Sequence, residues 1–314
     1  MKILERTEYL ERFMRLKGTP DIKIVTGLRR SGKSELLRQY VEKIKETDSR
    51  ANIIFIDYSD LSFDDYKNLY KYVEARFVEG MDNMVFVDEV QMCEKFELAI
   101  NSFHNSRKYD IYITGSNAFL LASDLSTLFT GRYIEISVFP FSFSEFCSYF
   151  EKNGEEPSAL NDFLKEGGLP GSYVYSDPFD KTTYIRDVFG TLIKRDLVEK
   201  YHIFEEARMD SLTDFLMDNI SSLTSSNKIS EALGKNGETV NRVTICNYLK
   251  YLCNAFLFYR VRRYDIKGKK YLETIEKYYL SDLSFRYALL GSRNMDYGRA
   301  YENMVAIELM RRGY

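Results

Sequence analysis

The sequence predicts an α/β fold whose core is a parallel sheet of about five strands covered by helices on both faces. Short, nearly continuous apolar runs recur along the first half of the chain, and stretches with helical spacing separate them, as in buried parallel strands. One of these runs, residues 22–26, leads directly into a glycine-rich segment that opens a helix. A mostly α-helical part is expected in the second half of the chain.

The glycine-rich segment fits the pattern G-x-x-x-x-G-K-[ST] without a mismatch. Its residues are Gly27, Leu28, Arg29, Arg30, Ser31, Gly32, Lys33 and Ser34. The two glycines let successive backbone N–H groups point at phosphate oxygens, and the helix that follows adds its positive N-terminal dipole. Lys33 is expected to reach the β- and γ-phosphates, and Ser34 to bind Mg²⁺. The segment therefore predicts a nucleotide phosphate site.

A second apolar run, residues 84–87, ends in the carboxylates Asp88 and Glu89. A parallel strand delivers such acids to the carboxyl edge of the sheet, beside the phosphate loop. Asp88 is expected to hold Mg²⁺ through its water shell, and Glu89 to orient the attacking water as a general base. The adjacent acids favour an ATPase over a small-molecule kinase. A P-loop kinase is therefore the weakest of the functions that the sequence allows.

Two further strands are expected at residues 111–114 and 134–136, and another at residues 52–57. Ser116 and Asn117, after the first of these, are both candidates for a polar sensor of the γ-phosphate. Arg132, just before the strand at 134–136, is the leading candidate for an arginine finger, in cis or from a neighbouring molecule. Arg29 and Arg30 of the phosphate loop are alternatives for that role.

The sequence after the sheet changes character. A capping box, Ser142 to Glu145, predicts a helix start, and the glycines between residues 167 and 171 predict a break. We expect an ATP-binding domain with lid helices at 1–180, a winged-helix domain at 181–290 and an incomplete further domain at 291–314.

The elements expected in the second domain are those of a winged helix. Helical spacing links Leu212, Phe215, Leu216, Ile220 and Leu223. A short helix covers 229–234, and Thr239 is expected to cap a third helix. Two strands around residues 265–269 complete the pattern helix, helix, helix, hairpin.

Basic residues gather on the expected hairpin and are the candidate DNA contacts: Arg260, Arg262, Arg263, Lys267, Lys269 and Lys270. Asn241, Arg242 and Thr244 at the start of the third helix form a modest set for reading bases. The alternative is a solvated hairpin whose lysines protect its edge from aggregation. The formal net charge of −3 argues against a strong generic DNA binder.

Composition excludes several classes of protein. The 314 residues contain no apolar run as long as the roughly 18–20 residues of a membrane span, and the N-terminus lacks a signal segment, so the cytoplasm is expected. The four cysteines and two histidines show no metal-binding spacing, which argues against zinc and disulfides.

The motifs GLRRSGKS, VFVDEVQ, ITGSNAFLL, TLFTGRY, VFPFSFSEF and GGLP occur in this order. In this respect the chain resembles the bacterial and archaeal AAA-type P-loop ATP-binding proteins that carry a winged helix and a C-terminal domain similar to restriction nucleases. The resemblance implies the sheet order 5-1-4-3-2, ATP as nucleotide and Mg²⁺ as cofactor, with the Walker roles on Lys33, Ser34, Asp88 and Glu89. It also implies that residues 301–314 are the first helix of the nuclease-like domain, ending at Gly313. Glu302 is one acidic residue, too few for metal-dependent cleavage, so no nuclease activity is expected of these residues.

The sequence therefore favours an Mg-dependent ATP-hydrolysing switch or motor of the AAA type, coupled to a winged helix. The alternative is a nucleotide-regulated DNA- or protein-binding regulator with little turnover. Oligomers are required only if the arginine finger comes from a neighbouring molecule.

Overall fold

The computed structural model describes residues 2–58, 65–115, 128–234, 240–262, 275–292 and 295–314. Contacts divide the chain into two compact units. The first comprises residues 1–27 and 32–138, and the second comprises residues 28–31 and 139–314. The four residues 28–31 lie inside the phosphate-loop motif, so the motif contributes to both units. Each unit is described separately.

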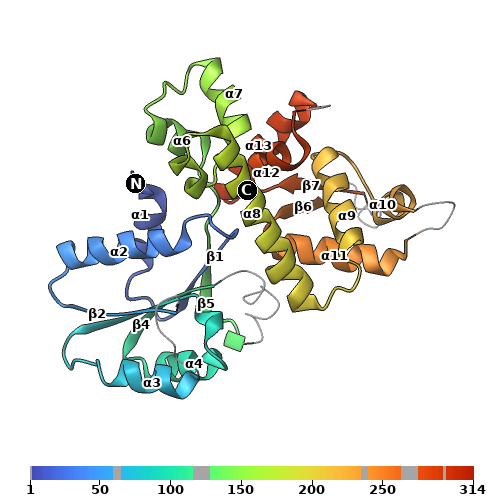
Figure 1. Cartoon of the computed structure of the whole chain (residues 1–314). Coiled ribbons are helices and arrows are strands. Elements are labelled where there is room, and N and C mark those ends of the chain that lie inside the picture. Colours follow the sequence, from blue (N-terminus) through green and yellow to red (C-terminus); the bar gives the residue numbers. More distant parts are fainter. Residues whose placement is uncertain (1, 59–64, 116–127, 235–239, 263–274, 293–294) are drawn as a thin grey trace, which may run out of the picture. The chain divides into compact units, whose positions relative to one another are not determined.

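The first unit is built on a five-stranded parallel sheet with the order β2-β3-β4-β1-β5 (Figure 1). The strands are β1 (Ile22–Thr26), β2 (Ala51–Asp57), β3 (Asp82–Asp88), β4 (Tyr109–Thr114) and β5 (Tyr133–Ser137). Read in the opposite direction, this is the order 5-1-4-3-2, so the expected fold class and strand order are confirmed. The insertion of β4 between β1 and β3 places the ends of these three strands side by side.

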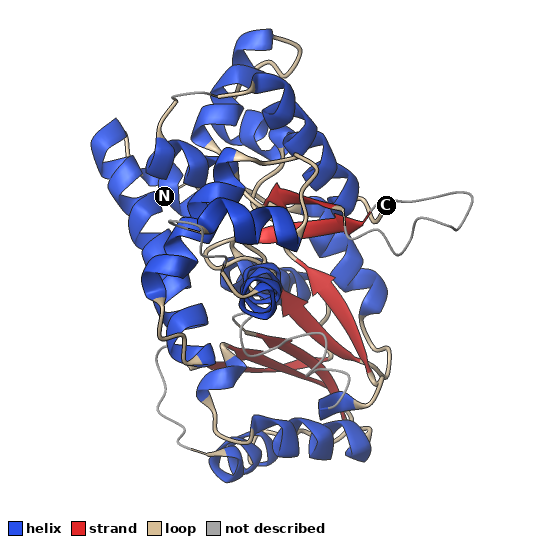
Figure 2. Cartoon of the chain, turned by 90° about the vertical axis from the view of Figure 1, so that its right-hand side faces the viewer, coloured by secondary structure: helices blue, strands red, loops and turns tan. Residues whose placement is uncertain are grey.

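Helices cover both faces of this sheet, as Figure 1 and, after a quarter turn, Figure 2 show. They are α1 (Thr7–Leu16), α2 (Lys33–Thr47), α3 (Tyr66–Glu74) and α4 (Phe96–Ser106), with a 3₁₀ turn η1 (Val90–Met92) after β3. Alternate residues of a strand enter opposite cores: Phe86 packs with α1 and α2, whereas Val85 and Val87 pack with α3 and α4. Burial on both faces explains why the central strand β3 is apolar from Met84 to Val87.

The second unit is mostly helical. Its helices are α6 (Phe143–Phe150), α7 (Pro157–Glu166), η2 (Pro170–Val174), α8 (Pro178–Thr191), η3 (Leu192–Glu199), α9 (Glu206–Asp218), α10 (Ser226–Leu233), α11 (Arg242–Asn254), α12 (Leu283–Leu290) and α13 (Tyr297–Arg311). An antiparallel pair, β6 (Phe258–Arg262) and β7 (Glu276–Leu280), is its sheet. The helices α6 and α7, expected as the lid of the nucleotide domain, are counted with this unit, and a functional boundary near residue 180 stays a prediction.

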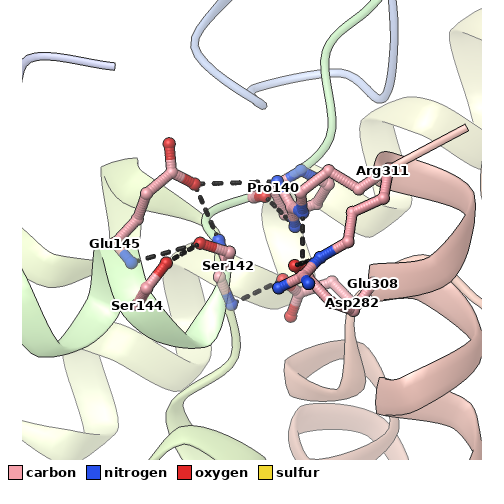
Figure 3. A network of polar contacts seen from close by, with 9 residues as sticks. Pro140, Ser142, Ser144, Glu145, Asp282, Glu308 and Arg311 are labelled. Carbon is pink, nitrogen blue, oxygen red and sulfur yellow. Dashed lines mark hydrogen bonds and ion pairs between the residues drawn. The ribbon is translucent and has the colours of Figure 1, made fainter. Parts of the chain in front are cut away.

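The motif VFPFSFSEF meets α13 and Asp282 in one polar network of the second unit (Figure 3), and the motif GGLP joins it through Gly168. Arg311 donates to the carbonyl oxygen of Pro140 at 2.8 Å and pairs with Glu145 and Glu308. Gly168 donates its backbone N–H to Asp282 at 2.6 Å. A side chain at Gly167 is excluded, because its Cβ would lie 2.1 Å from Asp282 Oδ1. These motifs are therefore explained by packing within the second unit.

Ser142 and Glu145 form the expected capping box, and α7 ends at Glu166, so both expectations about this region are confirmed. The cap of α11 is Asn241, whose side chain accepts a hydrogen bond from the Val243 N–H at 2.8 Å; Thr239 lies outside the described residues. Leu223 was expected on the apolar face of α9 but lies beyond the helix and is exposed.

The last helix, α13, packs on β7 through Asn303 and Ile307. Asn303 accepts from the Leu280 N–H at 2.7 Å and donates to the Leu280 carbonyl at 2.8 Å, while Ile307 is buried. Val305 and Leu309, on another side of the helix, are 53% and 46% exposed. Gly313 has φ +86° and ends α13 as expected, with the amide of Tyr314 bonded to Leu309 O.

In the described part of the chain, no helix combines the length and apolar character that crossing a membrane requires.

Candidate functional site

The phosphate loop begins and ends with glycines in backbone conformations that other residues rarely adopt. Gly27 has φ +139°, and a Cβ there would lie 2.1 Å from the carbonyl oxygen of Val138. Gly32 has φ +95° and is the N-cap residue of α2. Between them Arg30 also has a positive φ, 64°. Left-handed residues alternating with ordinary ones turn backbone N–H groups to one side of the chain, which makes a concave binding site for anions.

Lys33 is the first residue of α2 and is buried, with 6% of its surface exposed. Its Nζ donates to the carbonyl oxygen of Gly27 at 3.0 Å, so the side chain folds back across the loop that precedes it. An ammonium group held at the mouth of the loop, next to the N-terminus of a helix, is suited to bind phosphate oxygens.

Asp88, the last residue of β3, is 2% exposed and lies at the centre of a polar cluster. The hydroxyl of Thr114, at the end of β4, donates to its Oδ1, and the hydroxyl of Ser34 also hydrogen-bonds to the carboxylate. Burial raises the pKa of Asp88, and the charges of Glu89 and Asp57 raise it further, while the hydrogen bonds from Thr114 and Ser34 lower it. The buried carboxylate is therefore in a site that favours a cation.

Glu89 follows β3 in a strained conformation, with φ +55°. Its backbone N–H donates to Thr114 Oγ1 at 3.1 Å, and Gln91 donates to its carboxylate. The side chain is half-buried. Thr114 therefore contacts both acids, through the side chain of Asp88 and the backbone of Glu89.

A third carboxylate lies at the same edge. Asp57 ends β2, is in register with Asp88 on β3, and is 9% exposed. Arg38 of α2 donates to Asp57 Oδ2 at 2.5 Å, which balances part of the charge. The carboxyl edge thus carries three acids close to the start of α2.

The donor set fits Mg²⁺. This ion prefers oxygen ligands, binds through one or two carboxylates together with substrate phosphates, and keeps several waters. The Ser34 hydroxyl and the buried, electrostatically unfavourable Asp88 carboxylate supply such oxygens. Among the described residues, no three histidine, cysteine or acidic side chains lie close enough to hold a metal ion by themselves.

Arg132 cannot act in cis on this loop. Its backbone carbonyl accepts from the N–H of Ile22, the first residue of β1, at 3.0 Å, and its side chain donates to Asn105 at 3.0 Å. The phosphate loop follows Thr26, the last residue of β1, so Arg132 lies at the opposite edge, about 16 Å away along the strand. The expected finger role in cis is wrong, and a role toward a neighbouring molecule stays a prediction.

The other candidate residues are placed as follows. Ser116 and Asn117 lie outside the described residues, as do Arg263, Lys267, Lys269 and Lys270. Arg260 and Arg262 on β6 are exposed but share one partner, Glu276 on β7, at 3.9 and 3.5 Å.

The polar groups expected to read bases on α11 are partly engaged. Asn241 is used as the helix cap, and Arg242 donates to Ser226 at 3.1 Å.

Glu302, on the last helix α13, also has partners. It pairs with Lys277 at 2.6 Å and accepts a hydrogen bond from Tyr279 at 2.9 Å. These contacts reduce the charge that the hairpin and the last helix present.

Sequence reasoning missed Thr114 and Asp57. Each is a polar residue at the carboxyl end of an otherwise apolar strand, and that position was the available signal. Their neighbours become clear only from the strand order, which places β4 between β1 and β3 and places β2 beside β3.

Comparison with known proteins agrees with this geometry. Residues 19–147 match a family described as "AAA domain", and residues 158–296 match one described as "Domain of unknown function (DUF8612)". An uncharacterized protein from Haemophilus influenzae is 34% identical over 322 residues, which cover 99% of this chain and 80% of that protein. The uncharacterized protein MJ1544 from Methanocaldococcus jannaschii is 27% identical over 330 residues, covering 100% and 72%.

Among solved structures, Cdc6p from Pyrobaculum aerophilum matches 98% of this chain and 96% of its own, with a TM-score of 0.38 and 12% identity. That is a loose likeness. The match to the Haemophilus influenzae protein extends over nearly the whole chain. This chain therefore belongs to the same family as that protein, and its first half is a P-loop AAA domain.

Proposed function

We propose that this protein is a cytoplasmic, Mg-dependent, ATP-hydrolysing switch or motor of the AAA type. The observation that carries the proposal is the cluster around Asp88. The Ser34 hydroxyl at the start of α2 and the Thr114 hydroxyl at the end of β4 both bond to this buried carboxylate, and Thr114 also holds the backbone of Glu89. These are the elements that ATP hydrolysis needs, at one edge of one sheet.

Each residue then has a defined role. The loop N–H groups and Lys33 bind the phosphates, and Lys33 exchanges its contact with Gly27 O for phosphate oxygens. Ser34 and Asp88 hold Mg²⁺, which when bound neutralises charge on the β- and γ-phosphates. Glu89 accepts the proton of the attacking water, and Gln91 orients its carboxylate.

We further propose that the second unit contains a winged helix that responds to the nucleotide. The order α9, α10, α11, β6, β7 supports it. A bridge between Thr224 and Glu276 also supports it, because it adds the stretch between α9 and α10 to the edge of β7. Movement of this region between nucleotide states is the expected output.

The test is steady-state ATP turnover by the wild type, Glu89→Gln and Lys33→Ala proteins, with and without Mg²⁺. Glu89→Gln should keep ATP affinity and lose at least about 100-fold in turnover, since it removes the base and keeps the shape. Lys33→Ala should lose ATP binding. Equal turnover by the wild type and Glu89→Gln proteins would remove Glu89 from the mechanism.

A second candidate function is a nucleotide-regulated DNA- or protein-binding regulator with little turnover. The exposed face of α11, which includes Arg242 and Lys250, together with the exposed Arg260 and Arg262, favours it. The shared pairing of both hairpin arginines with Glu276 counts against a strong phosphate grip.

DNA retention by the Arg260→Ala/Arg262→Ala protein separates the two functions. If binding to duplex DNA weakens while ATP turnover is unchanged, the hairpin is a DNA contact. If the wild type retains no DNA at low salt, the DNA form of this candidate is excluded, because phosphate contacts are strongest there.

A further inference from the structure

Arg29, inside the phosphate loop, is held by a buried carboxylate. Its Nη1 lies 3.3 Å from Asp196 Oδ1 and 3.4 Å from Oδ2. The side chain of Asp196 is 7% exposed and that of Arg29 is 24% exposed. Residues 28–31 are counted with the second unit, so this ion pair lies inside it.

Two neighbouring loop residues, Leu28 and Arg30, lie in surroundings to which the helix that carries Asp196 contributes. Leu28 is fully buried in the apolar cluster that contains Leu192 and Leu197. The charge of Arg30 acts on Tyr184 of α8: burial raises the pKa of this phenol, and Arg30 lowers it in part. Residues 28–30 of the phosphate loop therefore all belong to the surroundings of the continuous helix formed by α8 and η3, which we call the α8–η3 helix.

Asp196 lies within the part of this helix that has π-helical hydrogen bonding. Residues 192–199 form a π-helix, and the amide of Ile203 still bonds to the carbonyl five residues earlier, Val198 O, at 3.0 Å. A π-wound segment is less favourable than an α-helix and occurs often at functional sites. Its conformation is therefore sensitive to a change in one contact.

Arg29 has two alternative anionic partners, the carboxylate of Asp196 and the phosphates of a bound nucleotide. Its planar guanidinium presents five N–H donors, and it binds phosphate as well as carboxylate in a forked geometry. The loop that carries Arg29 is the loop that binds the nucleotide phosphates. A nucleotide would bring two or more phosphate charges beside it, in competition with the single charge of Asp196.

We propose that Arg29 and Asp196 form a nucleotide-dependent latch. Without nucleotide, Asp196 holds Arg29 and stabilises the π-wound segment; when ATP binds, its phosphates compete for Arg29 and the α8–η3 helix loosens around Asp196. This inference rests on the proposed function of the loop and adds the route by which the second unit detects the nucleotide.

The first test is ATP affinity by isothermal titration calorimetry. Asp196→Asn should bind Mg-ATP about fivefold more tightly, because breaking one ion pair no longer opposes binding. In an Arg29→Ala background the same substitution should change the affinity by less than about twofold. Asp187→Asn, an exposed acid on the same helix, is the matched control and should behave as the wild type.

The second test reads the helix itself. Hydrogen exchange of the amides at residues 192–200 should speed up in the wild type when Mg-ATP is added. In Arg29→Ala it should already be fast without nucleotide, and it should change little when nucleotide is added. This measurement keeps the proposal testable if Asp196→Asn folds poorly.

The outcomes separate the latch from the function beneath it. If the wild type does not bind Mg-ATP, or Lys33→Ala binds it equally well, the proposed function fails and the latch fails with it. If Lys33→Ala loses binding but Asp196→Asn matches the wild type, and exchange in residues 192–200 ignores both nucleotide and Arg29→Ala, the latch alone is wrong.

Discussion

The substitution Thr114→Val removes the hydroxyl that hydrogen-bonds to both Asp88 and Glu89. Thr114 is fully buried, and valine has nearly its shape, so the change removes two hydrogen bonds and leaves the packing almost intact. One bond is the O–H donated to the Asp88 carboxylate. The other is accepted from the Glu89 N–H at 3.1 Å.

The magnitude follows from these two contacts. A hydrogen bond to a charged group contributes about 1.5–3 kcal/mol, and a buried N–H left without a partner costs about 1–3 kcal/mol. Burying the additional methyl group returns about 0.8 kcal/mol. We therefore expect Thr114→Val to lower the free energy of unfolding by about 2–5 kcal/mol.

Turnover should fall by about 30-fold, which corresponds to about 2 kcal/mol of lost positioning of Asp88 and Glu89 in the transition state. ATP affinity should change by less than about threefold, because Lys33 and the loop backbone are untouched.

The assays are urea unfolding of the nucleotide-free protein and steady-state ATP turnover. Thr114→Ser is the matched control, because it keeps the hydroxyl and loses only a methyl group; its turnover should stay within about threefold of the wild type. If Thr114→Val is as stable and as active as the wild type, or if Thr114→Ser is damaged as severely, the hydroxyl does not do what we assign to it.

Three further predictions concern Asp88, Gly27 and Arg132 of the first unit. Asp88→Asn should raise the unfolding free energy of the nucleotide-free protein by about 1 kcal/mol near pH 7. Burial raises the folded-state pKa of this acid above its ordinary value, so the wild type loses stability as pH rises through the folded pKa. The gain in unfolding free energy from Asp88→Asn should therefore shrink toward zero near pH 4. Urea titrations in which this gain grows at low pH would contradict the prediction. Gly27→Ala should cost more than about 2 kcal/mol in thermal unfolding, because its Cβ would lie 2.1 Å from a backbone oxygen, whereas Gly190→Ala, with no atom within 4 Å, should be neutral or slightly stabilising. Arg132→Ala should leave turnover within about twofold in dilute, monomeric protein; a large loss that appears only at concentrations where oligomers form would instead assign it to a neighbour's site.

The sheet and the phosphate loop could be predicted because their signals are local. A buried parallel strand is apolar on both faces, and the G-x-x-x-x-G-K-[ST] spacing meets a backbone requirement that Gly27 and Gly32 satisfy. Asp88 and Glu89 follow from the same logic, since the carboxyl ends of parallel strands share an edge.

What escaped prediction depends on contacts between distant residues. Thr114 and Asp57 are ordinary strand-end residues until the strand order sets them beside Asp88. Arg132 precedes its strand, and only the register of β5 on β1 shows that it lies at the wrong edge for the loop. The pairing of Arg29 with Asp196, 167 residues later, has no local signal at all.

The helix faces of the second unit were harder for a related reason. In α13 the polar Asn303 is buried because its amide pairs with the backbone of Leu280, while the apolar Val305 stays exposed. Hydrophobic spacing alone places these two the other way round. A buried amide that bonds to a strand backbone is favourable, but the sequence does not mark its partner.

The most direct test of the central claim is a single-turnover experiment in which the wild type and Glu89→Gln proteins are loaded with Mg-ATP and the bound nucleotide is identified over time. We predict that both proteins bind ATP with equal affinity, that the wild type converts it to ADP, and that Glu89→Gln retains it as ATP. Conversion at the same rate by both proteins, or no ATP bound by either, would contradict the assignment of this edge of the sheet as the site of hydrolysis.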